Sequence, residues 1–331
     1  MSVDITLSKE KTEPREVEPT VSDLSAATSA NEESALGPFG EHRGLMFATA
    51  YRMLGSVADA EDVLQDAWIN WAKADRDEVR NPKAYLVRTV TNLSLNRLTS
   101  AKAVRETYVG PWLPEPMLTS SLTSSLASSA AGDGAQEAEL AESVSTAMLV
   151  VLESLSPLER AVFVLREVFG YSHAEIGGML DRSEVSVRQV AHRAREHVQA
   201  RRPRFDTDVK QRSEILERFF AACQGGDLAE LLEVLAPDVT AWTDGGGVVR
   251  AARRPLYGAD HVARWLLGIA RKPEAEGLAA RLAEINGETG LLWIYGGQVG
   301  GVMTFDLAGG RIVNLRLQAN PEKLRGLGAS Q

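Results

Sequence analysis

The chain has few of the features that mark secreted, membrane-spanning or metal-cluster proteins. Its 331 residues contain one cysteine, Cys223, which excludes an intrachain disulfide and a cysteine-cluster zinc site. No run of about 18 apolar residues occurs, so no helix is expected to cross a bilayer. The N-terminal 37 residues lack the basic start and apolar stretch of a secretory signal. These absences predict a soluble, cytoplasmic protein that makes no membrane contact.

Histidine is also scarce. Of five histidines, His173 and His192 lie in an orderly helical segment, without cysteine or carboxylate neighbours that suggest metal ligation. We therefore expect no metal and no cofactor.

The net charge of −9 is unevenly distributed. Residues 1–38 and 110–142 each carry −5, whereas 39–109, 143–205 and 206–331 carry +1, +2 and −2. Residues 183–204 contain six basic and two acidic side chains. Because a phosphate backbone responds to charge within a Debye length of about 10 Å, the acidic total does not argue against DNA binding.

Composition and periodicity divide the chain into five segments. We predict a disordered acidic tail over 1–38, a helical module over 39–109, a flexible serine-rich linker over 110–142, a second helical module over 143–205 and an α+β domain over 206–331. In the last domain we expect a helix over 212–223 and strands over 239–243, 290–295, 299–306 and 312–319.

Residues 156–200 carry the sharpest local signal, that of a helix-turn-helix. Ser156 with Glu159, and Ser172 with Glu175, have the spacing of capping boxes that begin two helices. After a turn at 181–183, a third helix is expected to bury one apolar face, made of Val187, Val190, Ala191, Ala194 and Val198. Its opposite face carries Glu184, Arg188, His192, Arg195 and Gln199, which include donors to base edges and phosphates, and a basic cluster at 201–204 fits phosphate contact. The alternative is an ordinary helical hairpin with a solvated charged face.

The segment 56–71 predicts an amphipathic helix with an apolar stripe of Ala60, Val63, Leu64, Ala67, Trp68 and Trp71. Away from that stripe lies an acidic and polar ridge, which is either a solvated face or a docking surface for a basic partner. The next helix begins at Asn81-Pro82 and is expected to run to about residue 100, with Leu86, Val90 and Leu93 facing inward. Amides and guanidiniums on its other side suit nucleic-acid contact, although a charge of +1 predicts weak binding to duplex DNA by this module alone.

Together the two helical modules resemble the extracytoplasmic-function (ECF) sigma factors of bacterial RNA polymerase. DAEDVLQDAW at 59–68 resembles their core-polymerase docking helix, NPKAYLVRTVTNLSLNRL at 81–98 the helix that melts and reads the minus-ten element, and residues 155–196 the region 4 that reads the minus-thirty-five element. One departure is TSAKAVRE at 99–106, which has only Lys102 and Arg105 where an arginine-rich run often ends region 2.

The resemblance implies roles for three sets of residues. The core polymerase, through its beta and beta-prime subunits, would be contacted by Asp59, Glu61, Asp62, Gln65 and Asp66. Melted minus-ten DNA would be contacted by Arg88, Thr89, Asn92, Asn96 and Arg97. The minus-thirty-five element would be contacted by Ser183, Glu184, Ser186, Val187, Arg188, Gln189, His192, Arg193 and Arg195.

In the C-terminal domain, a leading helix and a strand-rich sequence with Trp242, Trp265 and Trp293 suggest a cone-shaped α+β fold around a pocket, and the domain resembles the SnoaL-like family. Three short motifs match the SigJ-like subgroup of ECF sigma factors, in which a fused SnoaL-like extension is thought to regulate in cis. They comprise Trp112, Leu113, Pro114, Glu115 and Pro116; Asp244, Gly245, Gly246 and Gly247; and Asn320, Pro321, Glu322, Lys323 and Leu324. Glu322 stands where the subgroup usually has Asp. We expect the glycine turn and the 320–324 tail to contact the linker or the helical modules.

Other functions remain open at this point. The extension could bind a small-molecule ligand, or act as an enzyme on a cyclic ketone with Asp238, Asp244, Tyr257 and His261 as acid–base candidates. A ligand-controlled helix-turn-helix repressor is a further alternative, but it would leave residues 39–108 unexplained. The leading prediction is a non-enzymatic sigma factor, monomeric when free, that binds core RNA polymerase and promoter DNA.

Overall fold

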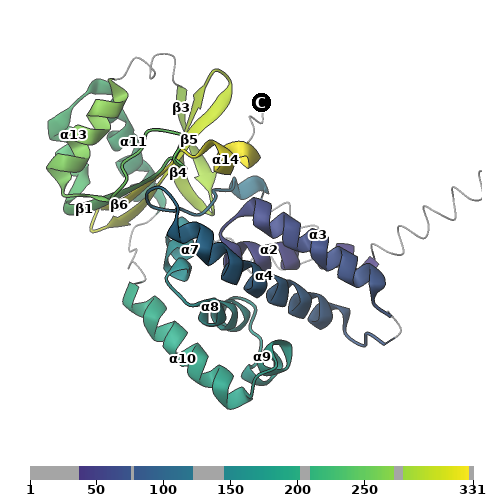
Figure 1. Cartoon of the computed structure of the whole chain (residues 1–331). Helices are drawn as coiled ribbons and strands as arrows, with labels where there is room; N and C mark the ends of the chain where they lie inside the picture. Colours follow the sequence, from purple (N-terminus) through teal and green to yellow (C-terminus); the bar gives the residue numbers. More distant parts are fainter. Residues whose placement is uncertain (1–36, 76–77, 122–144, 202–208, 272–278, 328–331) are drawn as a thin grey trace, which may run out of the picture. The chain divides into compact units, whose positions relative to one another are not determined.

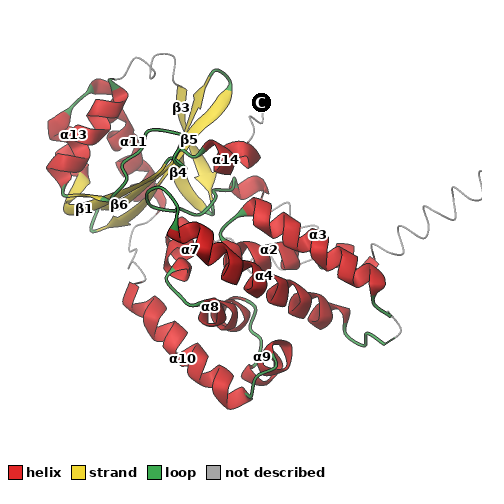
Figure 2. Ribbon diagram, viewed as in Figure 1, coloured by secondary structure: helices red, strands yellow, loops and turns green. Residues whose placement is uncertain are grey.

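A computed structural model describes residues 37–75, 78–121, 145–201, 209–271 and 279–327, with side chains of 101–106 excepted. Two all-α modules are followed in sequence by an α+β domain, which confirms the predicted fold class (Figures 1 and 2). The predictions for the acidic tail, the serine-rich part of the linker and the basic cluster beyond Arg201 lie outside the described residues.

The first module is built from three helices that share one apolar core. They are α2 (Arg43–Leu54), α3 (Val57–Lys73) and α4 (Pro82–Glu106). The Ser56 hydroxyl caps α3 by accepting from the Asp59 N–H. The predicted apolar stripe of α3 is buried apart from the half-exposed Trp68, which packs edge-on against Phe39. α4 is longer than predicted, because nothing in residues 101–106 interrupts a helix.

The second module contains the predicted helix-turn-helix. Its elements are α7 (Thr146–Glu153), α8 (Pro157–Phe163), α9 (His173–Leu180) and α10 (Glu184–Arg201). Both capping boxes are present, and Asp181 adopts a left-handed conformation (φ 52°) at the turn between α9 and α10. Every residue of the predicted apolar face of α10 is buried. A π-helical segment, Val164–Val168, follows α8 and was not predicted from the sequence.

The C-terminal domain is a six-stranded sheet with helices on one face. Its strands are β1 (Leu235–Asp244), β2 (Leu256–Tyr257), β3 (Ala279–Ile285), β4 (Glu288–Tyr295), β5 (Gln298–Ala308) and β6 (Arg311–Gln318), in the order β2-β1-β6-β5-β4-β3. Only the β1–β6 pair is parallel. The main core lies between this sheet and α11 (Val209–Gly225), α12 (Leu228–Val234) and α13 (Ala259–Ala270). A short helix, α14 (Pro321–Leu324), packs with β4 and β5 residues on a second, smaller core.

The four predicted strands are confirmed, but β2, β3, α12, α13 and α14 were missed. β2 has two residues, and β3 lies at a sheet edge where five of its seven residues are alanine or charged, so neither has a strong strand pattern. Trp265 and Trp293 pack on the helix-covered core, whereas Trp242 lies over Arg316 on the other side of the sheet, because side chains alternate along a strand.

Candidate nucleic-acid interface and the motif cluster beside it

The acidic ridge predicted on α3 is solvent-accessible. Glu61, Asp62, Gln65 and Asp66 are exposed, and Asp59 is half-buried. Glu61 accepts from the Arg43 guanidinium at 2.6 Å. Because α3 is held against α4 by its buried stripe, the ridge forms a fixed row of carboxylates and an amide.

Arg97 of α4 reaches across to this ridge. Its Nε donates to Asp59 Oδ1 at 2.8 Å, and its Nη2 donates to Asp62 Oδ2. Burial alone would lower the pKa of Arg97, but the two carboxylates raise it. The structure therefore places Arg97 with the predicted docking ridge rather than beside Arg88, Asn92 and Asn96.

The polar face of α4 meets the second module. Arg88 Nη2 lies 3.2 Å from Asp181 Oδ2, and the Asn92 amide donates to the Met179 carbonyl at 3.4 Å. Between them Val87 is fully buried in a cluster with α8, α9 and α10 side chains. Thr89 donates to the Tyr85 carbonyl, and Asn96 is exposed. Part of the predicted minus-ten surface is thus covered by α9.

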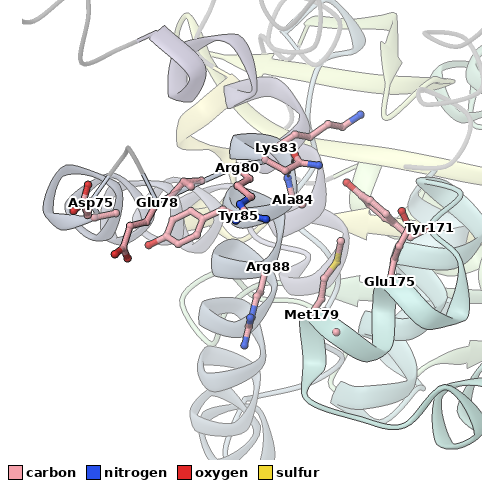
Figure 3. A pocket seen from close by; sticks show the side chains of 14 residues that line it. Asp75, Glu78, Arg80, Lys83, Ala84, Tyr85, Arg88, Tyr171, Glu175 and Met179 are labelled. Carbon is pink, nitrogen blue, oxygen red and sulfur yellow. Dashed lines mark hydrogen bonds between the residues drawn. The ribbon is translucent and has the colours of Figure 1, made fainter.

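A pocket of about 870 Å³ opens where these modules meet (Figure 3). The loop after α3 and the start of α4 supply one wall, and α9 with Tyr171 supplies the other. Its charged lining residues are Asp75, Glu78, Arg80, Lys83, Arg88 and Glu175. Three cations and three carboxylates give the pocket no strong preference for an anion or a cation.

The recognition helix α10 presents its predicted polar face to solvent. Glu184, Arg188, Gln189, His192, Arg193 and Arg195 are exposed, Ser183 is exposed and Ser186 is half-buried. Most of the charged groups are paired: Arg188 with Glu184 at 2.6 Å, Arg195 with Glu167 at 2.6 Å, and His192 with Glu196 at 3.2 Å. Glu196 is a carboxylate neighbour of His192 that the sequence analysis overlooked. In the part of the chain that the structure describes, no group of three or more possible metal ligands occurs.

Val187 is a wrong prediction as a DNA contact. Its side chain is 1 % exposed and packs with Ile176 and Met179, so it cannot reach a base. The apolar residue that α10 does present is Val185, which is 63 % exposed. Val185 lies two positions before Val187, on the opposite side of the helix from the buried face, so the helical periodicity could have predicted that its side chain is exposed.

The three short motifs, distant in sequence, meet around the Asp244 carboxylate. Asp244 is completely buried at the end of β1. Its Oδ1 accepts from Tyr108 Oη at 2.6 Å, and its Oδ2 accepts from the Leu113 N–H at 2.9 Å and from Lys323 Nζ at 2.8 Å. Gln318 Nε2 adds a longer contact at 3.3 Å. We call these residues the Asp244 cluster.

Lys323 and Asn320 complete the Asp244 cluster from the C-terminal side. Lys323 Nζ donates to the Leu113 carbonyl at 2.7 Å and lies 4.0 Å from the centre of the Trp112 ring. The Asn320 amide donates to Tyr108 Oη at 2.9 Å, while its Oδ1 caps α14. Burial and the Asp244 carboxylate raise the pKa of Tyr108, so its hydroxyl stays protonated.

The segment 108–119, which contributes Tyr108 and Leu113 to the Asp244 cluster, also forms hydrogen bonds with the first module. Glu115 Oε2 accepts from the Val57 N–H at 2.8 Å and from the Ser56 hydroxyl at 3.2 Å, at the start of α3. Burial raises the pKa of Glu115, although these donors oppose the shift. Tyr51 Oη donates to the Glu115 carbonyl at 2.6 Å and accepts from the Asn286 amide at 2.7 Å. Residues 108–119 therefore join α2 and α3 to the C-terminal domain.

Sequence reasoning missed Tyr108, Gln318 and Asn286. Asn286-Gly287 has the composition of a β-hairpin turn, and Asn286 does adopt positive φ (53°) between β3 and β4. Nothing local indicates that its side chain is 99 % buried against Tyr51, which precedes it by 235 residues. A turn residue is normally solvated, so this contact could not be inferred from the pattern.

The acid–base candidates do not form a site. Asp238, Tyr257 and His261 are exposed, whereas Asp244 is buried in the Asp244 cluster. The domain does carry a separate buried charged group, in which Arg316 makes two hydrogen bonds to Asp306 at 2.6 and 2.5 Å. Near it, burial raises the pKa of Glu288 to about 7, while Arg212 at 3.7 Å opposes the shift.

Both helical modules match known protein families, and known proteins are similar to this chain over most of its length. The families "Sigma-70 region 2" and "Sigma-70, region 4" match residues 39–104 and 145–198. ECF RNA polymerase sigma factor SigJ of Mycobacterium tuberculosis H37Rv is 36 % identical over 291 residues, covering 85 % of this chain and 90 % of that protein. Probable ECF RNA polymerase sigma factor SigI of M. tuberculosis CDC 1551 is 30 % identical, covering 87 % and 94 %.

A solved structure spans the C-terminal domain as well. The crystal structure of M. tuberculosis extracytoplasmic function sigma factor SigJ has 32 % sequence identity and a TM-score of 0.69, covering 88 % of this chain and 98 % of that one. Among the described helices, none is both long and apolar enough to span a membrane.

Proposed function

The chain belongs to the ECF RNA polymerase sigma factors, and on this premise we propose which surfaces carry each step of promoter recognition. Members of this family bind core RNA polymerase and promoter DNA. The observation that carries the proposal is that one chain holds both an exposed acidic ridge on α3 and an exposed recognition face on α10. A chain that only read one DNA element would not need the first module. The protein would act in the cytoplasm, where its polymerase is.

The acidic ridge is the proposed docking surface for the beta and beta-prime subunits. Carboxylates held in a row complement a basic partner surface and accelerate its encounter. Asp66 gives the cleanest test, because it is exposed and appears in none of the ion pairs of the described residues. Asp66→Lys is expected to reduce core binding at least tenfold, whereas Asp260→Lys, on the surface of α13, leaves it unchanged. Equal core affinity of the two variants would contradict this docking surface.

Promoter DNA is proposed to be read by α4 and α10. The minus-ten element would be contacted by Arg88, Thr89, Asn92 and Asn96. The minus-thirty-five element would be contacted by the exposed residues of α10. Two contacts on one duplex lie more than a helical turn, about 34 Å, apart. Arg88 pairs with Asp181 and Asn92 donates to the Met179 carbonyl, so the second module would have to separate from α4 to free both side chains for the minus-ten element.

The C-terminal domain is proposed to control this separation in cis. It contacts residues 108–119, which lie between the two helical modules in the sequence, through the Asp244 cluster. Run-off transcription with core enzyme and a promoter selected from a random-sequence library by the full-length holoenzyme tests both proposals. Start-site-specific transcripts are expected, and their yield should change when the Asp244 cluster is broken by Lys323→Met. Absence of any specific transcript with the full-length protein would contradict the proposed sigma-factor function. An unchanged transcript yield in the Lys323→Met variant would contradict the proposed control in cis.

A further inference from the structure

The loop that follows the glycine turn carries three arginines that have no ion-pair partner among the described residues. Arg250, Arg253 and Arg254 are exposed, and residues 245–259 contain no acidic side chain. None of the ion pairs formed by the described residues involves them. Two other exposed arginines of the same domain are neutralised, Arg218 by two glutamates and Arg264 by Asp260, and the exposed arginines that are in no ion pair of the described residues, such as Arg271 and Arg281, are not clustered in sequence. We call residues 248–254 the arginine loop.

The arginine loop lies against the chain that leaves α4. A Cβ placed on Gly110 would lie 3.6 Å from the Arg253 Cα, and one placed on Gly247 would lie 3.4 Å from the Val109 Cβ. Gly110 follows the last residue of α4 by four positions. The loop backbone at Arg253 therefore lies against the segment that directly follows the helix proposed to contact promoter DNA.

The arginine loop is held in this place by its own hydrogen bonds. The Val249 N–H donates to the Gly245 carbonyl at 2.9 Å, and the Thr243 hydroxyl donates to the Ala252 carbonyl at 2.9 Å. Gly246 has φ +64° and faces the Asn320 side chain so closely that a Cβ would lie 2.4 Å from it. The loop is thus fixed to the Asp244 cluster, which is itself attached to α2 and α3 through residues 108–119.

DNA binding by the first module needs more positive charge than that module contains. Residues 39–109 carry a net charge of +1, and Arg97 is engaged by two carboxylates. Duplex DNA presents one phosphate charge per about 1.7 Å of its axis. The nineteen residues from Arg88 to the end of α4 span about 27 Å, the length of about eight base pairs. A duplex that follows α4 from Arg88 therefore reaches the arginine loop.

We propose that the arginine loop is a second DNA-binding surface that contacts phosphates of the duplex flanking the element contacted by α4. This inference rests on the proposed function, because it needs α4 to lie on promoter DNA. Guanidinium groups suit the task, since they donate two parallel hydrogen bonds to a phosphate and remain charged at all working pH values. The contact is independent of base sequence, so it adds affinity without changing promoter choice.

The test measures binding of holoenzyme to DNA as a function of salt. The probe is a promoter selected from a random-sequence duplex library with wild-type holoenzyme, and the variant carries Arg250→Gln, Arg253→Gln and Arg254→Gln. Each lost phosphate contact should reduce the slope of log affinity against log salt by about 0.9, so the full effect is up to about 2.7. Affinity near 0.15 M salt should fall roughly tenfold or more, equally for all selected sequences.

A matched variant controls for the change in net charge. Arg264→Gln, Arg271→Gln and Arg281→Gln remove the same charge from exposed positions on α13, at its C-terminal end and on β3. This variant should keep the wild-type salt slope, and both variants should bind core enzyme like wild type. An unchanged slope in the arginine-loop variant would overturn the inference. So would weaker core binding with an unchanged slope, which would assign the loop to polymerase. If wild-type holoenzyme selects no promoter at all, the proposed function fails instead.

Cleavage mapping locates the contact. An iron chelate is attached at Val248→Cys in a Cys223→Ser background, since Val248 is 73 % exposed at the start of the loop. Hydroxyl radicals should cut the selected promoter in duplex DNA about eight base pairs from the α4 contact. Uncut DNA with an otherwise active holoenzyme would contradict the inference.

Discussion

The first helical module is joined to its two neighbours by different kinds of contact. Its interface with the second module is mainly apolar, because Val87 and α2 side chains share cores with α7, α8 and α10. Polar links also cross it, including an exposed ion pair whose Arg88 and Asp181 side chains are 47 % and 83 % accessible, and a buried hydrogen bond from Arg160 Nη1 of α8 to the Met53 carbonyl of α2 at 2.6 Å. Its connection to the C-terminal domain is made by buried polar groups, with Asp244 and Asn286 at most 1 % exposed.

This difference indicates which connection opens. Apolar burial is non-directional, so a polymerase surface that covers the same side chains can replace it. The buried Asp244 carboxylate, with five donors, has no such substitute, because each donor left unpaired costs free energy. We infer that the second module separates from the first, while the C-terminal domain stays attached through residues 108–119.

Breaking the Asp244 cluster should have the largest effect on stability. Asp244→Asn leaves the Lys323 ammonium, 12 % exposed, without its carboxylate. Loss of one partner of a buried pair should lower the free energy of unfolding by about 3–5 kcal/mol. Urea denaturation of the full-length protein measures it. Asp260→Asn, which removes an ion pair whose side chains are 64–65 % exposed, should leave the free energy of unfolding close to that of wild type, because solvent screens an exposed pair. If both variants lowered the free energy of unfolding by a similar amount, the buried Asp244–Lys323 pair would contribute no more to stability than an exposed pair, and the prediction would be contradicted.

At the other end of the same connection, Glu115→Ala should cost about 2 kcal/mol. It removes the oxygen that accepts from Val57, Ala58 and Ser56, leaving the start of α3 uncapped by the linker. Glu115→Gln keeps an acceptor and should cost less than half as much. Hydrogen exchange of the first turn of α3 measures the local effect. If the alanine variant exchanges there at the wild-type rate, the cap contributes nothing.

The apolar interface is tested by Val87→Ala. Val87 is fully buried between α4 and the second module, so deletion of two methyl groups should cost about 1.5–2 kcal/mol. Val90→Ala, at a position equally buried within the first module, controls for the loss of volume. Only Val87→Ala should make protease cleavage between residues 122 and 144 faster, because it weakens the contact that opens. Equal cleavage of both variants would show that opening does not pass through Val87.

Sequence patterns predicted the parts of this molecule that depend on neighbours along the chain. The two capping boxes, the buried stripe of α3 and the apolar face of α10 are set by spacings of three to seven residues, and all are confirmed. The Asp244 cluster could be predicted only in part from the sequence, because Tyr108, Gln318 and Lys323 are each more than 70 residues away from Asp244 in the chain. Resemblance identified its short motifs, but Tyr108 and Asn286 lack any local pattern that indicates a buried polar contact. Val187 was wrongly predicted as a DNA contact because the whole start of the recognition helix was assigned to DNA, although Val187 lies on the buried face and Arg188 on the exposed one.

The smallest effect is expected at the exposed link between the helical modules. Asp181→Asn removes the carboxylate that pairs with Arg88 but keeps a side chain that tolerates the left-handed conformation at φ 52°. An ion pair this exposed contributes at most about 0.5 kcal/mol, and salt screens it further. The unfolding free energy should therefore match that of wild type within error, at both 0.05 and 0.5 M NaCl. A loss above 1 kcal/mol that disappears at high salt would mean that electrostatics hold the two modules together, and the contrast between an apolar and a polar connection would have to be abandoned.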